Sequence, residues 1–426
     1  MKTFLRYASL NTLGMMGLSL YILADTFFIS ADMGADGLAA LNLAIPIYSL
    51  IHGSGLMLGM GGATRYALYR SQNRLKEASA AFTHAFFAGL GLAALYLLAG
   101  LFLSEPLARL MGAEGRVLPM TQVYLKVILL FAPAFLTNQV MIAFIRNDGA
   151  PQLALGAMLA GSFANILLDY LFIFPLRGGI LGAVIATGLA PLISLGVMSP
   201  HFIRKRNGFH LCACRPSPRL LGRIVALGLP SLITELSSAV VMILFNALML
   251  ALMGHTGVAA YGVVANLALV VAALHTGVAQ GAQPLASAAY GQKDSPTLKS
   301  LLKWALVTVS LLSAAIYAAV LMGAEEIASI FNAQGDAALQ RAAVQGLRLY
   351  FVGCLFSGVN IFLSIWFPAV DQAGRGQTLS LMRTLLLIPL ALGGTALFGV
   401  TGLWLAFPLA EALSLLAGCF LLKPVT

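Results

Sequence analysis

Long apolar segments alternate with short polar connections along the whole chain. A helix needs about 20 mostly apolar residues to cross the hydrocarbon core of a bilayer, where its backbone groups must hydrogen-bond within the segment. Breaks at charged residues, Gly and Pro divide the chain into twelve such segments. We place them at residues 10–32, 37–64, 78–103, 118–145, 152–176, 180–202, 222–251, 257–288, 302–322, 343–369, 378–397 and 401–422.

The composition excludes several classes of protein. Only 9% of the residues are charged and 60% are apolar, whereas a soluble domain carries roughly 25% charged residues. A water-soluble enzyme, a disordered chain and a nucleic-acid binder are therefore excluded. The net charge of +10 is explained by Lys and Arg in cytoplasmic loops. We expect an all-α integral membrane protein in the lipid bilayer of the cell membrane, multi-pass, with both termini cytoplasmic.

The two halves of the chain repeat each other. Residues 33–40 (MGADGLAA) match residues 253–260 (MGHTGVAA) at an offset of 220, and Gly179 matches Gly399 at the same offset. One offset that holds near both ends of a half indicates duplication. Because each half has an even number of spans, the halves form a parallel repeat, related by an axis along the membrane normal.

The repeat predicts the domain organisation. Residues 1–202 form an N-lobe of six transmembrane helices, and residues 222–426 form a C-lobe of six. The basic segment 203–221 is then a cytoplasmic linker between the lobes. Transporters of this kind commonly bind their substrate between such halves.

Four polar residues are predicted to meet inside the N-lobe. Asn165 and Asp169 lie one helical turn apart, and Thr187 lies on the antiparallel helix that follows, as far beyond the turn at Gly178 as Asp169 lies before it. Counting 1.5 Å per residue puts Asp25 and Asp169 at one depth, ~10 Å below the outer surface. These oxygens suit a hard cation such as Na⁺, or a proton shared between two acids. The alternative is that the two acids only fix helix packing.

The second half lacks this cluster. The repeat-related residues of Asp25, Asn165, Asp169 and Thr187 include no acid, because they are Phe245, Leu385, Pro389 and Phe407. The predicted ion site therefore belongs to the N-lobe alone.

Two further acids lie in the middle of predicted spans, Glu235 in the seventh and Glu411 in the twelfth. Ionisable groups inside a membrane are costly and are candidates for function. Either acid could attract a cationic substrate, serve as a second proton site, or make a helix-packing contact.

At this point the chain resembles a known family, the multidrug and toxic compound extrusion (MATE) transporters. The resemblance covers essentially the whole chain, including twelve spans in two lobes. The matching stretches are 24–28 (ADTFF), 59–63 (GMGGA), 145–149 (IRNDG) and Asn165-x-x-x-Asp169 with Thr187.

The resemblance implies a function. Family members export organic cations and other amphipathic drug-like compounds in exchange for Na⁺ or H⁺. The matching positions imply that Asp25, Asn165, Asp169 and Thr187 bind the coupling ion, as metal ligands only if it is Na⁺. No other cofactor is expected, and nothing demands more than a monomer.

Two departures limit the resemblance. Some members have a proline in the first helix, but residues 1–32 contain none. Some members also use acids in helices 7 and 10. Glu235 lies in helix 7, whereas helix 10 has no acid, so a C-lobe ion site is not expected.

Two other functions fit the sequence less well. A lipid-linked sugar flippase of the same superfamily carries an anionic pyrophosphate and should need basic residues on its cavity, whereas only Lys126 and Arg348 are expected well inside spans. A membrane enzyme is disfavoured because HExxH, GxSxG and CxxC motifs are absent from the sequence. We therefore expect a cation-coupled efflux antiporter and not an enzyme.

Overall fold

The computed structural model describes residues 2–332 and 336–422, and in these residues the only regular secondary structure is helical. The N-terminal half contains α1 (Lys2–Ser71), α2 (Leu75–Phe102), α3 (Ser104–Leu110), α4 (Val117–Leu130), α5 (Ala132–Asn147), α6 (Pro151–Ile173) and α7 (Gly179–Ile203). The C-terminal half contains α8 (Pro218–Gly291), α9 (Ser295–Met322), α10 (Ala324–Phe331), α11 (Ala337–Tyr350), the 3₁₀ turn η1 (Phe351–Gly353), α12 (Cys354–Ala369) and α13 (Ala373–Leu421).

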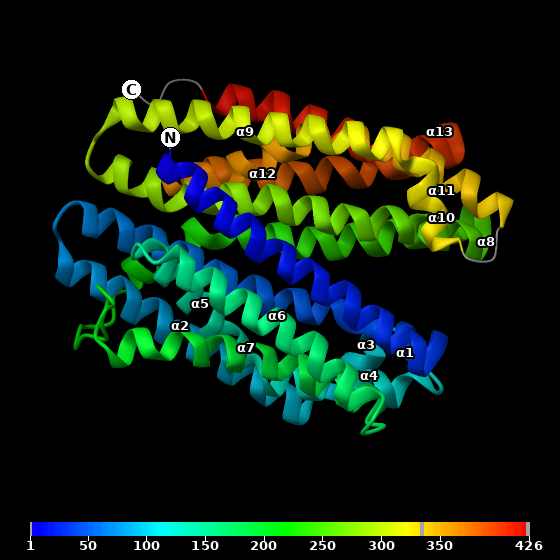
Figure 1. Ribbon diagram of the computed structural model, residues 1–426, viewed down its shortest axis with the longest axis horizontal. Coiled ribbons are helices and arrows are strands. Elements are labelled where there is room, and N and C mark those ends of the chain that lie inside the picture. The colour runs from blue at the N-terminus through cyan, green and yellow to red at the C-terminus, as the bar shows by residue number, and fades with distance from the viewer. Residues whose placement is uncertain (1, 333–335, 423–426) are drawn as a thin grey trace.

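Three of these helices are pairs of spans joined at a glycine. Gly34 in α1, Gly254 in α8 and Gly399 in α13 have φ values of 59°, 64° and 59°, in the region that glycine adopts without steric cost. In Figure 1, α1 runs to one end of the molecule and returns. A hydrogen bond of 2.9 Å between the hydroxyls of Tyr21 and Tyr48 joins its two halves.

The predicted number of spans is confirmed. In the described residues nine helices, with α1 already divided at its kink, are long and apolar enough to cross a membrane, and the pair α4–α5, bent by 49°, makes a tenth. Dividing α8 and α13 at their kinks adds two more, which gives twelve.

The backbone repeats at the predicted offset of 220. Gly34 corresponds to Gly254 and Gly179 to Gly399, and all four have positive φ. Outside glycine, the positive φ of Asn73 (59°) corresponds to that of Lys293 (58°). The short helices α3 and α10 begin at residues 104 and 324. The parallel repeat is thus a property of the fold as well as of the sequence.

The two halves form two layers of helices in Figure 1, with α2 and α4–α7 in one and α9 and α11–α13 in the other. Helix α1 begins and α13 ends at the same end of the molecule. We call it the basic end, because its connections between helices carry Arg74, residues 204–206 (RKR) and Lys293. The opposite end, which holds Gly34, Gly254 and Gly399, is the kink end.

The lobes exchange helix ends at the basic end. Phe4 and Ala8 of α1 are buried in the core of the C-lobe, and Ile224 of α8 is buried in the core of the N-lobe. Phe4 and Ile224 are related by the repeat offset, so the exchange is reciprocal. Close approach requires glycine here, because a Cβ on Gly61 would lie 1.9 Å from the Ile224 carbonyl oxygen.

Polar contacts also join the lobes at this end. Arg146 of α5 donates to Gln280 of α8 at 2.7 Å and to Asn11 of α1 at 2.9 Å. Gln283 of α8 accepts from Asn147 at 3.0 Å and donates to Thr64 at 2.9 Å. These contacts and the close glycine packing form what we call the basic-end seal.

The segment between α7 and α8 packs on the N-lobe. Phe209 is fully buried, with its ring 4.6 Å from that of Phe82. The Gly208 N–H donates to the Asp148 carboxylate at 2.7 Å, and the Ser217 N–H donates to His84 at 2.9 Å. This part of the predicted linker is therefore anchored to one lobe.

Candidate functional site

The four polar residues predicted to meet in the N-lobe are all buried. Asp25 lies in the first half of α1, Asn165 and Asp169 lie in α6, and Thr187 lies in α7, with exposed fractions between 0% and 6%. Asn165 Nδ2 donates to Thr187 Oγ1 at 3.4 Å. Asp25 lies close enough to Asp169 for their charges to interact. The structure thus brings all four together, and we call them the N-lobe acidic cluster.

The acidic cluster presents oxygens without donors. Asp25 Oδ1, Asn165 Oδ1 and both oxygens of Asp169 are buried, and none of them has a hydrogen-bond partner in the described part of the chain. Burying such acceptors unpaired is costly. A bound cation, or a proton on one carboxyl group, would satisfy them, because each supplies positive charge where only acceptors converge.

Tyr124 of α4 belongs to the same neighbourhood and was missed by the sequence analysis. Its side chain is buried, within electrostatic reach of Asp25 and Asp169 and beside the Thr187 hydroxyl. A tyrosine in an apolar helix carries no distinctive sequence signal, although counting its depth along α4 could have suggested it. Its hydroxyl can donate to a carboxylate or accept from a protonated one.

Glu235 lies at the contact between the lobes. Its Oε2 lies 3.4 Å from Nδ1 of His52 in the second half of α1, and its side chain is 33% exposed. A Cβ on Gly53 would lie 3.1 Å from the Cβ of Glu235. Glu235 is thus a half-exposed acid beside a residue of the opposite lobe.

Glu411 is held in a buried ion pair. Arg383 Nη2 donates to Glu411 Oε1 at 2.7 Å, and its Nε donates at 3.0 Å. Asn360 of α12 donates to Glu411 Oε2 at 2.7 Å. The side chains of Arg383 and Glu411 are 15% and 4% exposed. The charge of Glu411 is therefore balanced locally.

The expectation that only Lys126 and Arg348 lie well inside spans is wrong. Arg383 lies ten residues after the start of α13 and reaches Glu411 across the kink at Gly399. Arg348 instead has a side chain that is 47% exposed. In the sequence alone, Arg383 groups with the Lys and Arg of the cytoplasmic segments, because it lies near the start of the predicted span 378–397.

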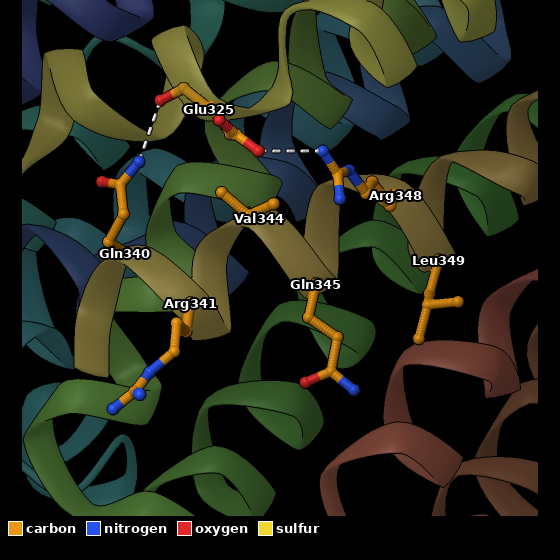
Figure 2. Close-up of a pocket in the computed structure, with 7 residues that line it drawn as sticks. All are labelled: Glu325, Gln340, Arg341, Val344, Gln345, Arg348 and Leu349. Atoms are coloured by element: carbon orange, nitrogen blue, oxygen red, sulfur yellow. Dashed lines mark hydrogen bonds and ion pairs between the residues drawn. The ribbon is translucent and has the colours of Figure 1, made fainter. Parts of the chain in front are cut away.

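Arg348 lines a pocket of about 560 Å³ between α10 and α11, shown in Figure 2. Its Nη2 lies 3.2 Å from Oε1 of Glu325, and Gln340 donates to the Glu325 carbonyl at 2.9 Å. Both polar contacts stay within the C-lobe. This pocket includes no residue of the acidic cluster.

A second cavity, of about 160 Å³, lies inside the C-lobe. Arg383 and Glu411 line it, together with hydroxyl side chains of α8 and aromatic rings of α8, α11 and α13. In the described residues, no three His, Cys, Asp or Glu side chains gather to form a site for a metal ion.

Comparison with known proteins agrees with this architecture. The family model MatE matches residues 12–171 and 230–392. The multidrug export protein MepA of Staphylococcus saprophyticus is 26% identical, over 93% of this chain and 88% of its own. MepA of Staphylococcus aureus strain MRSA252 is 23% identical, over 98% and 92%.

Solved structures have the same fold. A MOP superfamily transporter from Pyrococcus furiosus, described as having a binding pocket of reverse polarity, superposes with a TM-score of 0.92 at 24% identity, over 99% of this chain and 94% of its own. An outward-facing MATE multidrug resistance transporter superposes with a TM-score of 0.92 at 25% identity, with the same coverage. This chain belongs to the MatE family, the multidrug and toxic compound extrusion transporters.

Proposed function

We propose that this chain is a multidrug efflux antiporter of the cell membrane that exchanges small organic cations for Na⁺ or H⁺. The observation that carries the proposal is the N-lobe acidic cluster, where four buried acceptor oxygens have no donor among the described residues. The names of the MepA relatives support the export of drugs. The proposal requires one copy of the chain and no cofactor beyond the coupling ion.

The orientation follows from charge. Because Lys and Arg of short loops stay on the cytoplasmic side, the basic end faces the cytoplasm and both termini lie inside. The basic-end seal then closes the cytoplasmic side. Among the described residues, the hydrogen bonds and ion pairs between the lobes lie between this end and the His52–Glu235 contact. Contacts gathered on the cytoplasmic side support an outward-facing state in the proposed cycle.

Coupling depends on the ion and the drug favouring different states. A ligand that binds both states equally shifts nothing. In this mechanism Na⁺ or H⁺ enters from the outside and neutralises Asp25 and Asp169. Loss of their negative charge weakens the hold on a cationic drug, which leaves. The half-exposed Glu235 at the lobe contact supplies a further acid that faces the drug.

The flippase alternative receives one supporting observation, since Arg383 lines a cavity. However, Arg383 is already paired with Glu411, so the two charges cancel. An anionic pyrophosphate carries several charges and would need a net positive cavity. The antiporter therefore remains the better proposal.

The test is efflux of ethidium from cells that lack their own pumps, with a Na⁺ gradient and a pH gradient imposed separately. Wild type is compared with Asp25→Asn and Asp169→Asn. Asp32→Asn is the matched control, because Asp32 lies in the same helix and is exposed. We expect one gradient to drive efflux in wild type and in the control, and neither gradient to drive it in the two cluster variants.

Two results would contradict the proposal. Efflux that survives both cluster substitutions would reduce the acidic cluster to a packing contact. A wild type that exports ethidium at the same rate with and without either gradient would exclude coupling to Na⁺ and H⁺.

A further inference from the structure

The C-lobe cavity combines aromatic walls with one guanidinium group. The rings of Tyr350 and Phe407 lie parallel, 4.2 Å apart, and both residues line the cavity with Tyr261. Arg383 enters the lining from α13. The cavity is therefore shaped for a flat group that also carries a polar atom.

The charged groups of this cavity are paired with each other, except for one nitrogen of the guanidinium group. Glu411 already accepts from Arg383 on both oxygens and from Asn360. Ser237 and Thr384 are hydrogen-bonded to each other. In contrast, the hydrogen bonds of Arg383 in the described part of the chain start from Nε and Nη2, which leaves Nη1 to donate to a ligand. A ligand that brings an acceptor therefore matches the cavity, and a planar carboxylate suits a guanidinium group best.

The volume limits what can enter. A protein cavity of about 150 Å³ is known to hold a benzene ring, and this cavity measures about 160 Å³. One carboxyphenyl group fits this space, while a fused three-ring system is too large for it and would have to stay outside the cavity.

We propose that the C-lobe cavity binds the aromatic carboxylate of a zwitterionic substrate through Arg383. This inference rests on the proposed export function and names a substrate class for it. Arg383 shares its N–H groups between Glu411 and the substrate carboxylate, and the ring stacks against Tyr350 and Phe407. The cationic part of the substrate remains on the side of Glu235 and the N-lobe acidic cluster.

The test uses two dyes that differ only at the carboxylate. Rhodamine 110 carries a free benzoate beside its cationic ring system, and rhodamine 123 is its methyl ester. Binding to the purified full-length protein in lipid nanodiscs is followed by fluorescence polarisation at equilibrium. No gradient is applied, so the result does not depend on coupling. Failure of the proposed antiport would instead be seen as dye binding without gradient-driven efflux.

Arg383→Gln should weaken the binding of rhodamine 110 at least about tenfold, which is the loss expected for a hydrogen bond to a charged group. The affinity for rhodamine 123 should not change. Arg348→Gln, on the same lobe but in the other pocket, is the matched control and should change neither dye. Unchanged rhodamine 123 binding and a monodisperse elution profile verify folding. If Arg383→Gln fails to fold, Arg383→Lys replaces it and should weaken rhodamine 110 selectively.

Glu411→Gln should change the affinity for rhodamine 110 in the opposite direction. It releases Arg383 from its negative partner, so rhodamine 110 should bind more tightly than to wild type. The inference is overturned if wild type binds rhodamine 110 no better than rhodamine 123. It is also overturned if Arg383→Gln weakens both dyes equally, or if Glu411→Gln weakens rhodamine 110.

Discussion

The N-lobe and the C-lobe share one backbone plan but hold opposite chemistry. In the N-lobe, Asp25 and Asp169 are buried, and Asp25 Oδ1 and both carboxylate oxygens of Asp169 have no donor among the described residues. In the C-lobe, Glu411 is buried to a similar extent but accepts from Arg383 and Asn360. The buried acids of the N-lobe therefore have no positive charge beside them, whereas Glu411 in the C-lobe is paired with Arg383.

The difference shows which features duplication preserves. Positive φ is kept at Gly34 and Gly254 and at Asn73 and Lys293, because these turns set the fold of each half. The polar side chains are not kept, since Asp25 corresponds to Phe245, which is fully buried in the C-lobe core. A repeat can hold its backbone constant while its two sites diverge.

The largest effect on ion coupling is expected at the acidic cluster. In wild type we expect the coupling ion to weaken ethidium binding at least about fivefold, the lower end of typical coupling between sites. In the double variant Asp25→Asn with Asp169→Asn, ethidium binding should no longer depend on Na⁺ or pH, because no charge remains to be neutralised. Titration of the purified protein checks this. The same ion dependence in the double variant would place coupling elsewhere.

The C-lobe ion pair should act mainly on stability. Removing one partner of a buried pair costs about 3–5 kcal/mol, whereas replacing both by apolar residues is often neutral. Arg383→Met alone should therefore lower the free energy of unfolding sharply, and Arg383→Met with Glu411→Met should restore most of it. Thermal unfolding in detergent measures both. If the double variant is as unstable as the single one, the loss of stability does not come from an unpaired buried charge, and the account of the pair is wrong.

The basic-end seal is the part that both lobes contribute equally. A methyl group on Gly61 would meet the Ile224 carbonyl oxygen, and one on Gly281 would meet Cα of Ala8 at 2.6 Å. These two positions are related by the repeat. Each Gly→Ala change should destabilise the closed seal by about 1–3 kcal/mol, the usual cost of overpacking.

Gly222→Ala is the control for both variants, because nothing lies within 4 Å of its added Cβ. Melting temperatures should fall for Gly61→Ala and Gly281→Ala by similar amounts and not fall for the control. Unequal losses would mean that the seal is less symmetric than the backbone.

The smallest effect is expected at Tyr124. Tyr124→Phe removes a hydroxyl beside the acidic cluster. It should weaken the binding of the coupling ion about two- to tenfold, which corresponds to the loss of one hydrogen bond. Tyr170→Phe is the control, because that side chain is 53% exposed. The ion concentration that half-saturates efflux gives the measurement, and equal values for the two variants would remove Tyr124 from the site.

Much of this architecture could be predicted from the sequence. The lengths of the apolar segments predicted the twelve spans, and the matches at an offset of 220 predicted the repeat. Both patterns can be read along the chain without knowing which helices touch. The clustering of Asp169 and Thr187 followed from equal distances to a tight turn, where Gly179 has a φ of 51°. The role of these residues in ion binding stays a prediction.

The Arg383–Glu411 pair could not be predicted in the same way. Arg383 lies 16 residues before Gly399 and Glu411 lies 12 after it, so equal counting from the turn would not pair them. Their contact depends on how the two halves of α13 pack after the kink. The burial of the Asp148 side chain also depends on contacts distant in sequence. This side chain is 2% exposed and hydrogen-bonded to Tyr66 and Arg70, and the segment after α7 packs against it through the Gly208 N–H.

The most direct test of the difference between the lobes is gradient-driven ethidium transport in proteoliposomes, with Asp169→Asn and Glu411→Gln measured side by side. Both variants remove one buried negative charge from a membrane-spanning helix. The account predicts that Asp169→Asn abolishes the response to the Na⁺ or pH gradient, while Glu411→Gln retains it. Retained coupling in Asp169→Asn together with lost coupling in Glu411→Gln would contradict the account and move the ion site to the C-lobe.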